Sequence, residues 1–268
     1  MRKETNKIFI GTSGYKHSDW TGNVYPYKLT PVDYLPYYIK QLNLNFLELT
    51  FTFHKIPYVK TIEQIVEHIK NENINFRVSI KLHKSLLRKV LERSILNEFL
   101  SGLKPFFEKN ISIIYLADYP IEFTASKENL QSIITLKGSL ENCVFFVSLP
   151  HRSWYKERYI EMFRDNKIGL VIHYIPESTQ DDSPFFAITT NSFAYFRFYS
   201  NSTFYLPSSN INVLYNYSTK NLDRISKIVS KLAIITKETY VCFCNVKNGI
   251  AAYNAMLFKK IMEGTIYE

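Results

Sequence analysis

Eight short runs rich in β-branched and aromatic residues alternate with amphipathic stretches along the whole chain. The runs have the length of buried strands and lie at residues 8–12, 46–50, 75–81, 111–116, 143–148, 168–173, 194–199 and 239–244. Stretches with helical periodicity separate most of them, at residues 58–71, 91–109, 126–138, 155–166, 218–235 and 249–263. Thr30-Pro31 is expected to open one more helix, with an N-cap and a proline at the first helical position. Residues 185–190 offer a short extra strand, and 173–194 shows no convincing helix.

Eight strands alternating with helices over about 250 residues predict an α/β fold, a TIM-like (β/α)8 barrel. A doubly wound open sheet is the alternative that shares this alternation. It is less favoured because Gly11 and Gly14, after the first strand, lack the spacing and the following helix of a dinucleotide-binding fingerprint. No linker or change of composition divides the chain, so we expect residues 1–268 to form a single domain.

Composition excludes several classes of protein. Apolar residues make up 46% of the chain and charged residues 21%, which argues against disorder. No apolar run approaches the ~20 residues of a membrane span, and the first residues do not resemble a signal peptide. Cys143, Cys242 and Cys244 are too few for a disulfide framework, and they complete no zinc site. We therefore expect a soluble, cytoplasmic protein with reduced thiols and no membrane partner.

The formal net charge of +9 favours an anionic partner without naming one. Phosphorylated metabolites, nucleic acid and anionic surfaces all fit it. The densest basic stretch lies at 81–93, where only Glu92 opposes the positive side chains. It suggests contacts to nucleic-acid phosphates, but a solvated face explains it more simply, and no nucleic-acid motif accompanies it. The oligomeric state and any cofactor stay open.

Side-chain alternation predicts which residues point into the barrel. The outer face of each strand packs against helices and is apolar, so polar residues on a strand belong to the interior or the rim. The second, third and seventh strands therefore direct inward Phe46, Glu48, Thr50, Arg77, Ser79, Lys81, Tyr195, Arg197 and Tyr199. On the eighth strand Val241, Phe243 and Asn245 share a face, with Asn245 at its C-terminal end.

Active sites of such barrels lie at the C-terminal ends of the strands. Within about two residues of such ends are Glu48, Lys81, Arg197, Tyr199 and Asn245, and Ser13, Ser148 and His173 end three other strands. One interpretation is a buried ionic network that merely pairs its charges. The other starts from two cations against one carboxylate, an excess that an anionic ligand would balance. We favour the second. Arg77 lies at the opposite end and is expected to be structural.

The chain resembles the YecE-like family (domain of unknown function 72), of which it is identified as a divergent member. The resemblance rests on an ordered set of segments: Ile10-Gly-Thr-Ser-Gly-Tyr15, Trp20-Thr-Gly22, Tyr25-Pro26, Leu47 to His54 with Pro57, Phe76 to Lys81, Ser153-Trp154, Tyr195-Phe-Arg197, Tyr217-Ser218 and Phe243 to Asn254. It implies a TIM-like barrel and supplies no activity. Its distinctive polar positions fall on Glu48, Lys81, Arg197 and Asn245.

The chain also departs from the family pattern. Ser148-Leu149-Pro150 stands where the family has Glu-Phe-Arg, and Tyr199-Ser200 stands where it has His-Gly. Cys244 replaces one of two adjacent asparagines. Because several polar groups are missing, any chemistry of the family can be altered or lost here.

Other polar motifs have a functional and a structural interpretation. His17-Ser-Asp19 has a spacing that can ligate metals, but no second cluster supports it, so no metal site is predicted. His54 and His173 stand near strand ends, where histidine can act as an acid or base, although a hydrogen-bonded structural histidine is commoner. A Ser13–Lys81 catalytic pair is not favoured.

Aromatic and sulfur side chains have a similar choice of roles. Trp20, Tyr25 and Trp154 can form an aromatic rim around a ligand or close the top of the barrel. Cys242 and Cys244 lie among apolar neighbours and are expected to act as small buried hydrophobes.

The favoured hypothesis is a barrel that binds, and can transform, a small phosphorylated or carboxylated metabolite at its C-terminal mouth. Glu48 and Lys81 are the candidate catalytic residues, while Arg197, Tyr199, Asn245, Trp20 and Tyr25 are the candidate substrate-binding residues. A degenerate, non-catalytic ligand-binding barrel is the first alternative. A nucleic-acid-associated protein is the second.

Overall fold

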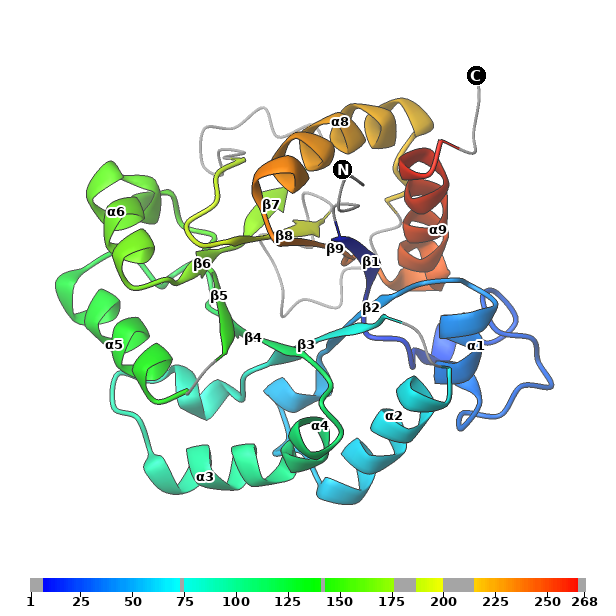
Figure 1. The fold of residues 1–268 in the computed structure, drawn as a ribbon, viewed down its shortest axis with the longest axis horizontal. Coiled ribbons are helices and arrows are strands. Elements are labelled where there is room, and N and C mark those ends of the chain that lie inside the picture. Colours follow the sequence, from blue (N-terminus) through cyan, green and yellow to red (C-terminus); the bar gives the residue numbers. More distant parts are fainter. Residues whose placement is uncertain (1–6, 73–74, 141–142, 176–186, 200–214, 265–268) are drawn as a thin grey trace, which may run out of the picture.

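The strands of the protein form one parallel sheet. The computed structural model describes residues 7–72, 75–140, 143–175, 187–199 and 215–264. Within these ranges the strands are β1 (Lys7–Ser13), β2 (Phe46–Leu49), β3 (Arg77–Lys81), β4 (Ile113–Asp118), β5 (Val144–Ser148), β6 (Gly169–Leu170), β7 (Ile172–Tyr174), β8 (Phe193–Phe198) and β9 (Glu238–Phe243). Every pairing between them is parallel, and helices surround the sheet (Figure 1).

The helices cover the outside of the sheet with their apolar faces. They are α1 (Tyr34–Lys40), α2 (Val59–Asn71), α3 (Arg93–Gly102), α4 (Lys104–Glu108), α5 (Lys127–Gly138), α6 (Glu157–Asp165), α8 (Thr219–Ile235) and α9 (Ile250–Met262). In α2, for example, Ile62, Ile65, Val66 and Ile69 are buried, which is the i, i+3, i+4, i+7 spacing of one helix face. Short 3-10 helices, such as Lys84–Leu87 and Arg152–Tyr155, follow several strands.

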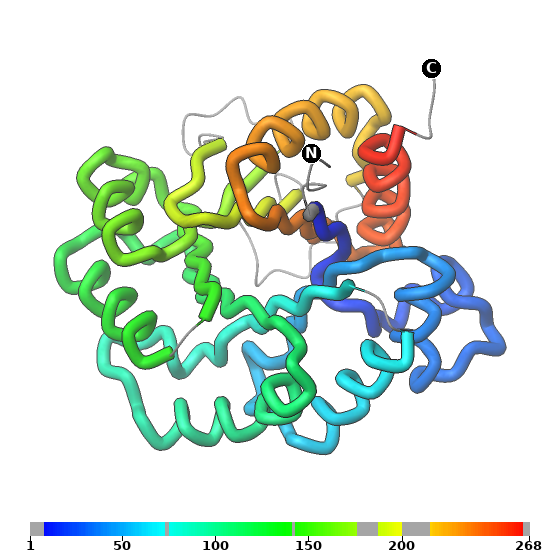
Figure 2. The backbone as a smooth tube through the Cα atoms, in the orientation of Figure 1, coloured from blue at the N-terminus to red at the C-terminus, as the bar shows by residue number. Residues whose placement is uncertain are grey.

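The sheet is a nearly closed barrel. Its strand order is β6-β5-β4-β3-β2-β1-β9-β8-β7, so the first strand lies between β2 and β9, and Figure 2 shows it beside the orange C-terminal strand. The two ends of this order, β6 and β7, are consecutive in the chain. β6 pairs with β5 and β7 pairs with β8, while the Val171 N–H between them donates to the Val147 carbonyl at 2.9 Å. One stretch of chain therefore changes partner and brings the two ends of the sheet together.

The predicted TIM-like barrel is confirmed, and the open-sheet alternative is wrong because its two edges would lie far apart. Each of the eight predicted runs overlaps a strand, and the sixth is divided into β6 and β7 at Val171. The predicted helix start at Thr30 is wrong. Residues 31–33 form a turn in which the Thr30 hydroxyl donates to Asp33 Oδ2 at 2.6 Å, and α1 begins at Tyr34. Of the optional strand at 185–190, residues 187–190 form none, and the rest lies outside the described residues.

Aromatic side chains fill the middle of the barrel. Phe46, Phe146, Tyr195 and Tyr240 meet there with ring centroids 5.3–6.3 Å apart. The two tyrosines point their hydroxyls to opposite ends: Tyr240 donates to Glu238 at 2.9 Å and Tyr195 donates to Glu48 at 2.7 Å. This aromatic layer separates a polar group at the N-terminal end from a polar cluster at the C-terminal mouth.

Candidate functional site

Inward-facing polar residues at the C-terminal ends of seven strands form the candidate site. We call this set the mouth cluster, and it consists of Ser13, Glu48, Lys81, Asp118, Ser148, His173 and Arg197. Each residue occupies an inward position of its strand, and parallel strands bring their C-terminal ends to one side of the barrel. Local sequence thus places seven hydrogen-bonding side chains above the aromatic layer.

Arg197 is the centre of the mouth cluster. Its Nη2 donates to Glu48 Oε1 at 3.0 Å, while its Nη1 lies 3.1 Å from Asp118 Oδ1 and 3.4 Å from Ser148 Oγ. The side chain is only 3% exposed. A guanidinium this deeply buried depends on paired carboxylates, because removing it from water costs several kcal/mol. Arg197 therefore joins three strands and has both terminal nitrogens committed to partners.

Glu48 is completely enclosed. Its Oε1 accepts hydrogen bonds from Ser13 Oγ (2.9 Å) and Arg197, and its Oε2 accepts from Tyr195 OH (2.7 Å) and Cys242 Sγ (3.8 Å). None of its side chain is exposed. The sequence proposed Glu48 as an acid or base acting on a ligand. The four donors instead favour a positioning residue that holds Arg197.

Lys81 and Asp118 are the charged members of the mouth cluster that solvent reaches. Lys81 Nζ lies 2.7 Å from Asp118 Oδ2, and both side chains are 18% exposed. The Lys81 ammonium also lies over the Phe53 ring, 4.7 Å from its centroid. Burial alone would raise the pKa of Asp118, but the positive charges of Arg197 and Lys81 outweigh it and hold this pKa well below its usual range. Asp118 is therefore a carboxylate throughout the neutral pH range.

Asp118 corrects the charge count made from the sequence. Lys81 and Arg197 against Glu48 gave an excess of one positive charge, but Asp118 contacts both cations and balances them. The sequence prediction ended the fourth strand at residue 116, two positions short of Asp118. Extending the alternation from Ile114 and Leu116 by one more inward position would have found it.

His173 is neutral and bonded to a serine. Its Nε2 lies 3.0 Å from Ser148 Oγ, which also faces Arg197. Burial lowers the pKa of His173 to about 3, and the nearby charge of Arg197 adds to the effect. This hydrogen bond agrees with the structural interpretation of His173. His54, the other candidate histidine, is exposed beside the Phe53 ring.

The remaining predicted binding residues lie in different surroundings. The centroid of the Tyr199 ring is 5.1 Å from the Arg197 guanidinium, so Tyr199 lies directly beside the mouth cluster. Asn245 lies two residues beyond the end of β9, and its Nδ2 donates to the Tyr215 carbonyl at 3.4 Å. The face it shares with Val241 and Phe243 is the outer one: Phe243 packs on Phe258 of α9. The inner face of β9 carries Tyr240 and Cys242 instead.

Trp20 and Tyr25 are buried in the loop after β1. Trp20 Nε1 donates to the Val246 carbonyl at 2.6 Å, and the Tyr25 hydroxyl donates to the Tyr15 carbonyl at 2.7 Å. The Tyr25 ring stacks on Tyr34 at 4.1 Å. With 0% and 1% exposure, both side chains fit the alternative in which these aromatics close the top of the barrel.

His17 and Asp19 have separate partners. His17 Nε2 lies 3.1 Å from the Ser13 carbonyl, whereas Asp19 Oδ2 accepts from the Asn248 N–H at 2.7 Å. Among the described residues no group of three or more His, Cys, Asp and Glu side chains is arranged to hold a metal ion. In the same part of the chain, no helix has the length and apolar character needed to cross a membrane.

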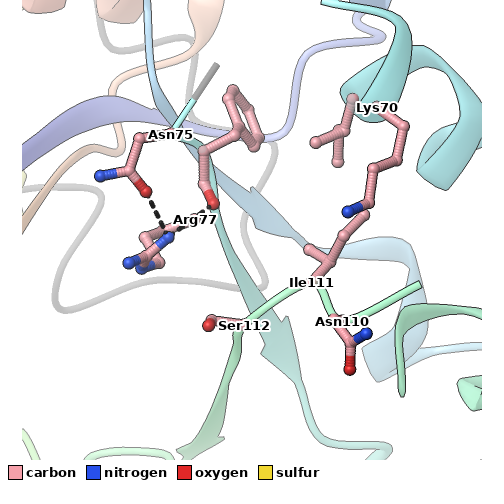
Figure 3. A pocket seen from close by; sticks show the side chains of 8 residues that line it. Lys70, Asn75, Arg77, Asn110, Ile111 and Ser112 are labelled. Atoms are coloured by element: carbon pink, nitrogen blue, oxygen red, sulfur yellow. Dashed lines mark hydrogen bonds between the residues drawn. The ribbon is translucent and has the colours of Figure 1, made fainter. Parts of the chain in front are cut away.

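The opposite end of the barrel carries a second polar group. Arg77 donates to both carboxylate oxygens of Glu238, at 2.8 and 2.6 Å, and to Asn75 Oδ1 at 2.7 Å. This agrees with the structural role expected of Arg77. A pocket of about 170 Å³ lies beside it, and Figure 3 shows Lys70, Asn110 and Ser112 around its edge. The ends of barrels where strands begin serve stability rather than binding.

Fold and site together define a TIM-like (β/α)8-barrel protein with a charge-balanced polar cluster at its C-terminal mouth. The model of the family described as "Protein of unknown function DUF72" matches residues 9–266. The chain therefore belongs to this family, as the resemblance in its sequence indicated.

Solved structures agree with this assignment. A DUF72 family protein from Thermotoga maritima MSB8 is 29% identical, with a TM-score of 0.83 over 96% of this chain and 99% of that chain. A DUF72 family protein from Enterococcus faecalis V583 is 21% identical, with a TM-score of 0.78 over 96% and 98%. SacUVDE, 10% identical with a TM-score of 0.52 over 97% and 98%, shares the fold alone. A comparison with curated proteins gives no match.

Proposed function

We propose that the chain binds a small phosphorylated or carboxylated metabolite at the C-terminal mouth of the barrel, with Lys81 as the cation that contacts it. The observation that carries this proposal is the contrast between the two cations of the mouth cluster. Arg197 is buried between two carboxylates, whereas Lys81 is partly open to solvent. An ammonium has three N–H donors, and among the described residues Asp118 is the one carboxylate that takes any of them.

The balanced charges narrow the class of ligand. Asp118 already balances the charge of Lys81, so a ligand with one uncharged acceptor atom would gain little free energy by binding there. Phosphate and carboxylate groups offer several charged oxygens and form charge-assisted hydrogen bonds, which are roughly twice as strong as neutral ones. Tyr199, whose ring lies against Arg197, would line the same mouth. Asn245 stays a candidate for orienting the ligand from the loop after β9.

Any reaction at this site would use Lys81 and Asp118, the charged members of the mouth cluster that solvent reaches. Glu48 would then position Arg197 rather than exchange protons with the ligand. A non-catalytic ligand-binding barrel is the second candidate function. It is favoured by the enclosure of Glu48, all of whose acceptor positions face donors of the protein. We propose the cytoplasm as the location, with the three free cysteines as support.

A thermal-shift screen tests the proposed function. Phosphorylated and carboxylated metabolites are added to the wild type and to Lys81→Gln, with Lys60→Gln as a control that removes an exposed lysine of α2. A ligand at 100 times its Kd adds about 2.7 kcal/mol of stability. We expect a shift in the wild type and in Lys60→Gln that disappears in Lys81→Gln. An equal shift in all three proteins would contradict the assignment to Lys81.

A further inference from the structure

Two cysteines of β9 and its end lie together beneath the mouth. Cys242 Sγ and Cys244 Sγ are 4.0 Å apart, and both face the barrel interior. Cys242 has no exposed surface, while Cys244 is half-buried. Cys143, the third cysteine, precedes β5 at the opposite end of the barrel and donates to the Leu140 carbonyl. The sequence interpretation of Cys242 and Cys244 as small hydrophobes leaves their mutual approach unexplained.

We propose that Cys242 and Cys244 form a reversible disulfide when the protein meets a low-molecular-weight disulfide such as oxidised glutathione. Residues two apart in a strand have Cα atoms separated by roughly 6.6 Å. That separation lies near the upper limit of about 6.8 Å at which disulfides form. Cys244 is the first residue after β9, and its N–H donates to the Phe198 carbonyl of β8 at 2.9 Å, so closing the disulfide loosens this last hydrogen bond and leaves the pairing of β9 itself in place. A disulfide at this limit is easily reduced, as expected of a regulatory one.

The two cysteines have different roles in this exchange. The Cys244 thiolate, at the partly open position, attacks one sulfur of glutathione disulfide and releases one glutathione thiolate. Cys242 then attacks the Cys244 sulfur of the mixed disulfide and releases the second glutathione. Two protein thiols and one glutathione disulfide thus give one protein disulfide and two glutathione thiols. The Cys242 proton ends on the leaving glutathione thiolate, and Glu48 Oε2, 3.8 Å from Cys242 Sγ, loses the thiol as a donor.

Formation of the disulfide would change the hydrogen bonding of the mouth cluster. In the reduced protein the Cys242 thiol donates to Glu48, the carboxylate that holds Arg197. Closing the disulfide removes this S–H donor and draws the sulfur toward Cys244. Weaker binding of an anionic ligand after oxidation would follow, a consequence that rests on the proposed function. The formation of the disulfide does not depend on it.

Thiol counting on the folded protein tests the proposal. The wild type is incubated with oxidised glutathione, denatured in acid and alkylated with N-ethylmaleimide, and its peptides are identified by mass spectrometry. We expect the label on Cys143 alone, a Cys242–Cys244 linkage in a protein lighter by two hydrogen atoms, and full labelling after dithiothreitol. Cys143→Ser is the control that keeps the pair, and it should still lose both remaining thiols. Cys244→Ser should keep Cys242 labelled.

Three outcomes would overturn the proposal. One is labelling of all three cysteines in the oxidised wild type. Another is a glutathione adduct that persists on Cys244 without closing onto Cys242. The third is a linkage that involves Cys143 or a second chain. The circular dichroism of each variant confirms that it is folded before oxidation. Because no ligand is used, these outcomes are independent of the thermal-shift screen.

Discussion

At the scale of single residues, Arg197 and its two carboxylates explain most of the candidate site. The sequence identified Glu48, Lys81 and Arg197 correctly as inward residues at one mouth, because polar side chains alternate there with apolar ones. It missed Asp118, since strand ends are the least certain part of a pattern and this residue lies just past the predicted end. It could not show that Glu48 is enclosed, because its four donors come from three other strands: Ser13 of β1, Tyr195 and Arg197 of β8, and Cys242 of β9.

Replacing Glu48 with glutamine should destabilise the protein strongly. The change keeps the shape of the side chain but leaves Arg197 and Lys81 to share one carboxylate, Asp118, so that the buried cluster carries an unbalanced positive charge. We expect a loss of about 3–5 kcal/mol in the free energy of unfolding. Glu92→Gln is the control, since it breaks the exposed pair with Arg88 and should cost less than about 1 kcal/mol. Urea unfolding of both variants measures the difference. Equal stability of Glu48→Gln and wild type would show that the network does not hold the barrel mouth.

His173 should make stability depend on pH below neutrality. Its pKa of about 3 in the folded protein lies under the value of about 6.5 expected when unfolded, so between these values the unfolded chain binds more protons. The stabilisation is therefore complete above pH 6.5 and declines as pH falls. Between about pH 7.5 and 5 the loss should be about 2 kcal/mol. In His173→Asn this part of the decline should vanish, and an unchanged pH profile would contradict a buried neutral imidazole.

At the scale of elements, strand and helix positions follow from the sequence, and their connections do not. The periodicities of two and 3.6 residues located each strand and most helices within a few residues. The split of the sixth run at Val171 depends on pairing with two different strands, which no local pattern records. The start of α1 at Tyr34 instead of Thr30 depends on a turn closed by Asp33. Such choices are made by tertiary contacts.

The contact between β1 and β2 gives a prediction at this scale. A Cβ at Gly11 would lie 1.7 Å from the Phe46 carbonyl oxygen, a backbone atom held in the sheet. Gly11→Ala should therefore cost about 3 kcal/mol, the upper range for overpacking. Gly138→Ala is the matched control: a Cβ there meets no atom within 4 Å, and alanine favours a helix by up to about 1 kcal/mol. Thermal unfolding should separate the two variants, and equal melting temperatures would contradict the close approach of the strands.

At the scale of the whole molecule, the net charge of +9 lies outside the mouth cluster, whose own charges balance. Lys84, Arg88, Lys89 and Arg93 of the basic stretch are exposed beyond β3. The overall charge therefore attracts anions over long range, while selection among them falls to Lys81 and its neighbours. The sequence yielded the total charge but not this separation, which depends on where each side chain lies.

The salt dependence of binding distinguishes the long-range attraction of the surface charge from the local contact at Lys81. Raising the salt concentration from about 0.05 to 0.5 M shortens the range of exposed charges to a few ångströms. A metabolite held at Lys81 should keep most of its thermal shift, because partly buried pairs are screened less. Any association with DNA or RNA should be lost, since nucleic-acid binding falls steeply with salt. A metabolite shift that disappears together with nucleic-acid binding would point to the surface charge and away from the mouth.

The central claim, that Lys81 contacts an anionic ligand, is tested most directly by calorimetric titration of the strongest ligand from the screen. Each binding isotherm gives a Kd for the wild type, Lys81→Gln, Lys81→Arg and the control Lys60→Gln. Losing a charged hydrogen bond of about 1.5–3 kcal/mol predicts a Kd at least tenfold weaker in Lys81→Gln. Lys81→Arg should recover part of the affinity, and Lys60→Gln should bind like the wild type. An unchanged Kd in Lys81→Gln would contradict the account and move the ligand away from this mouth.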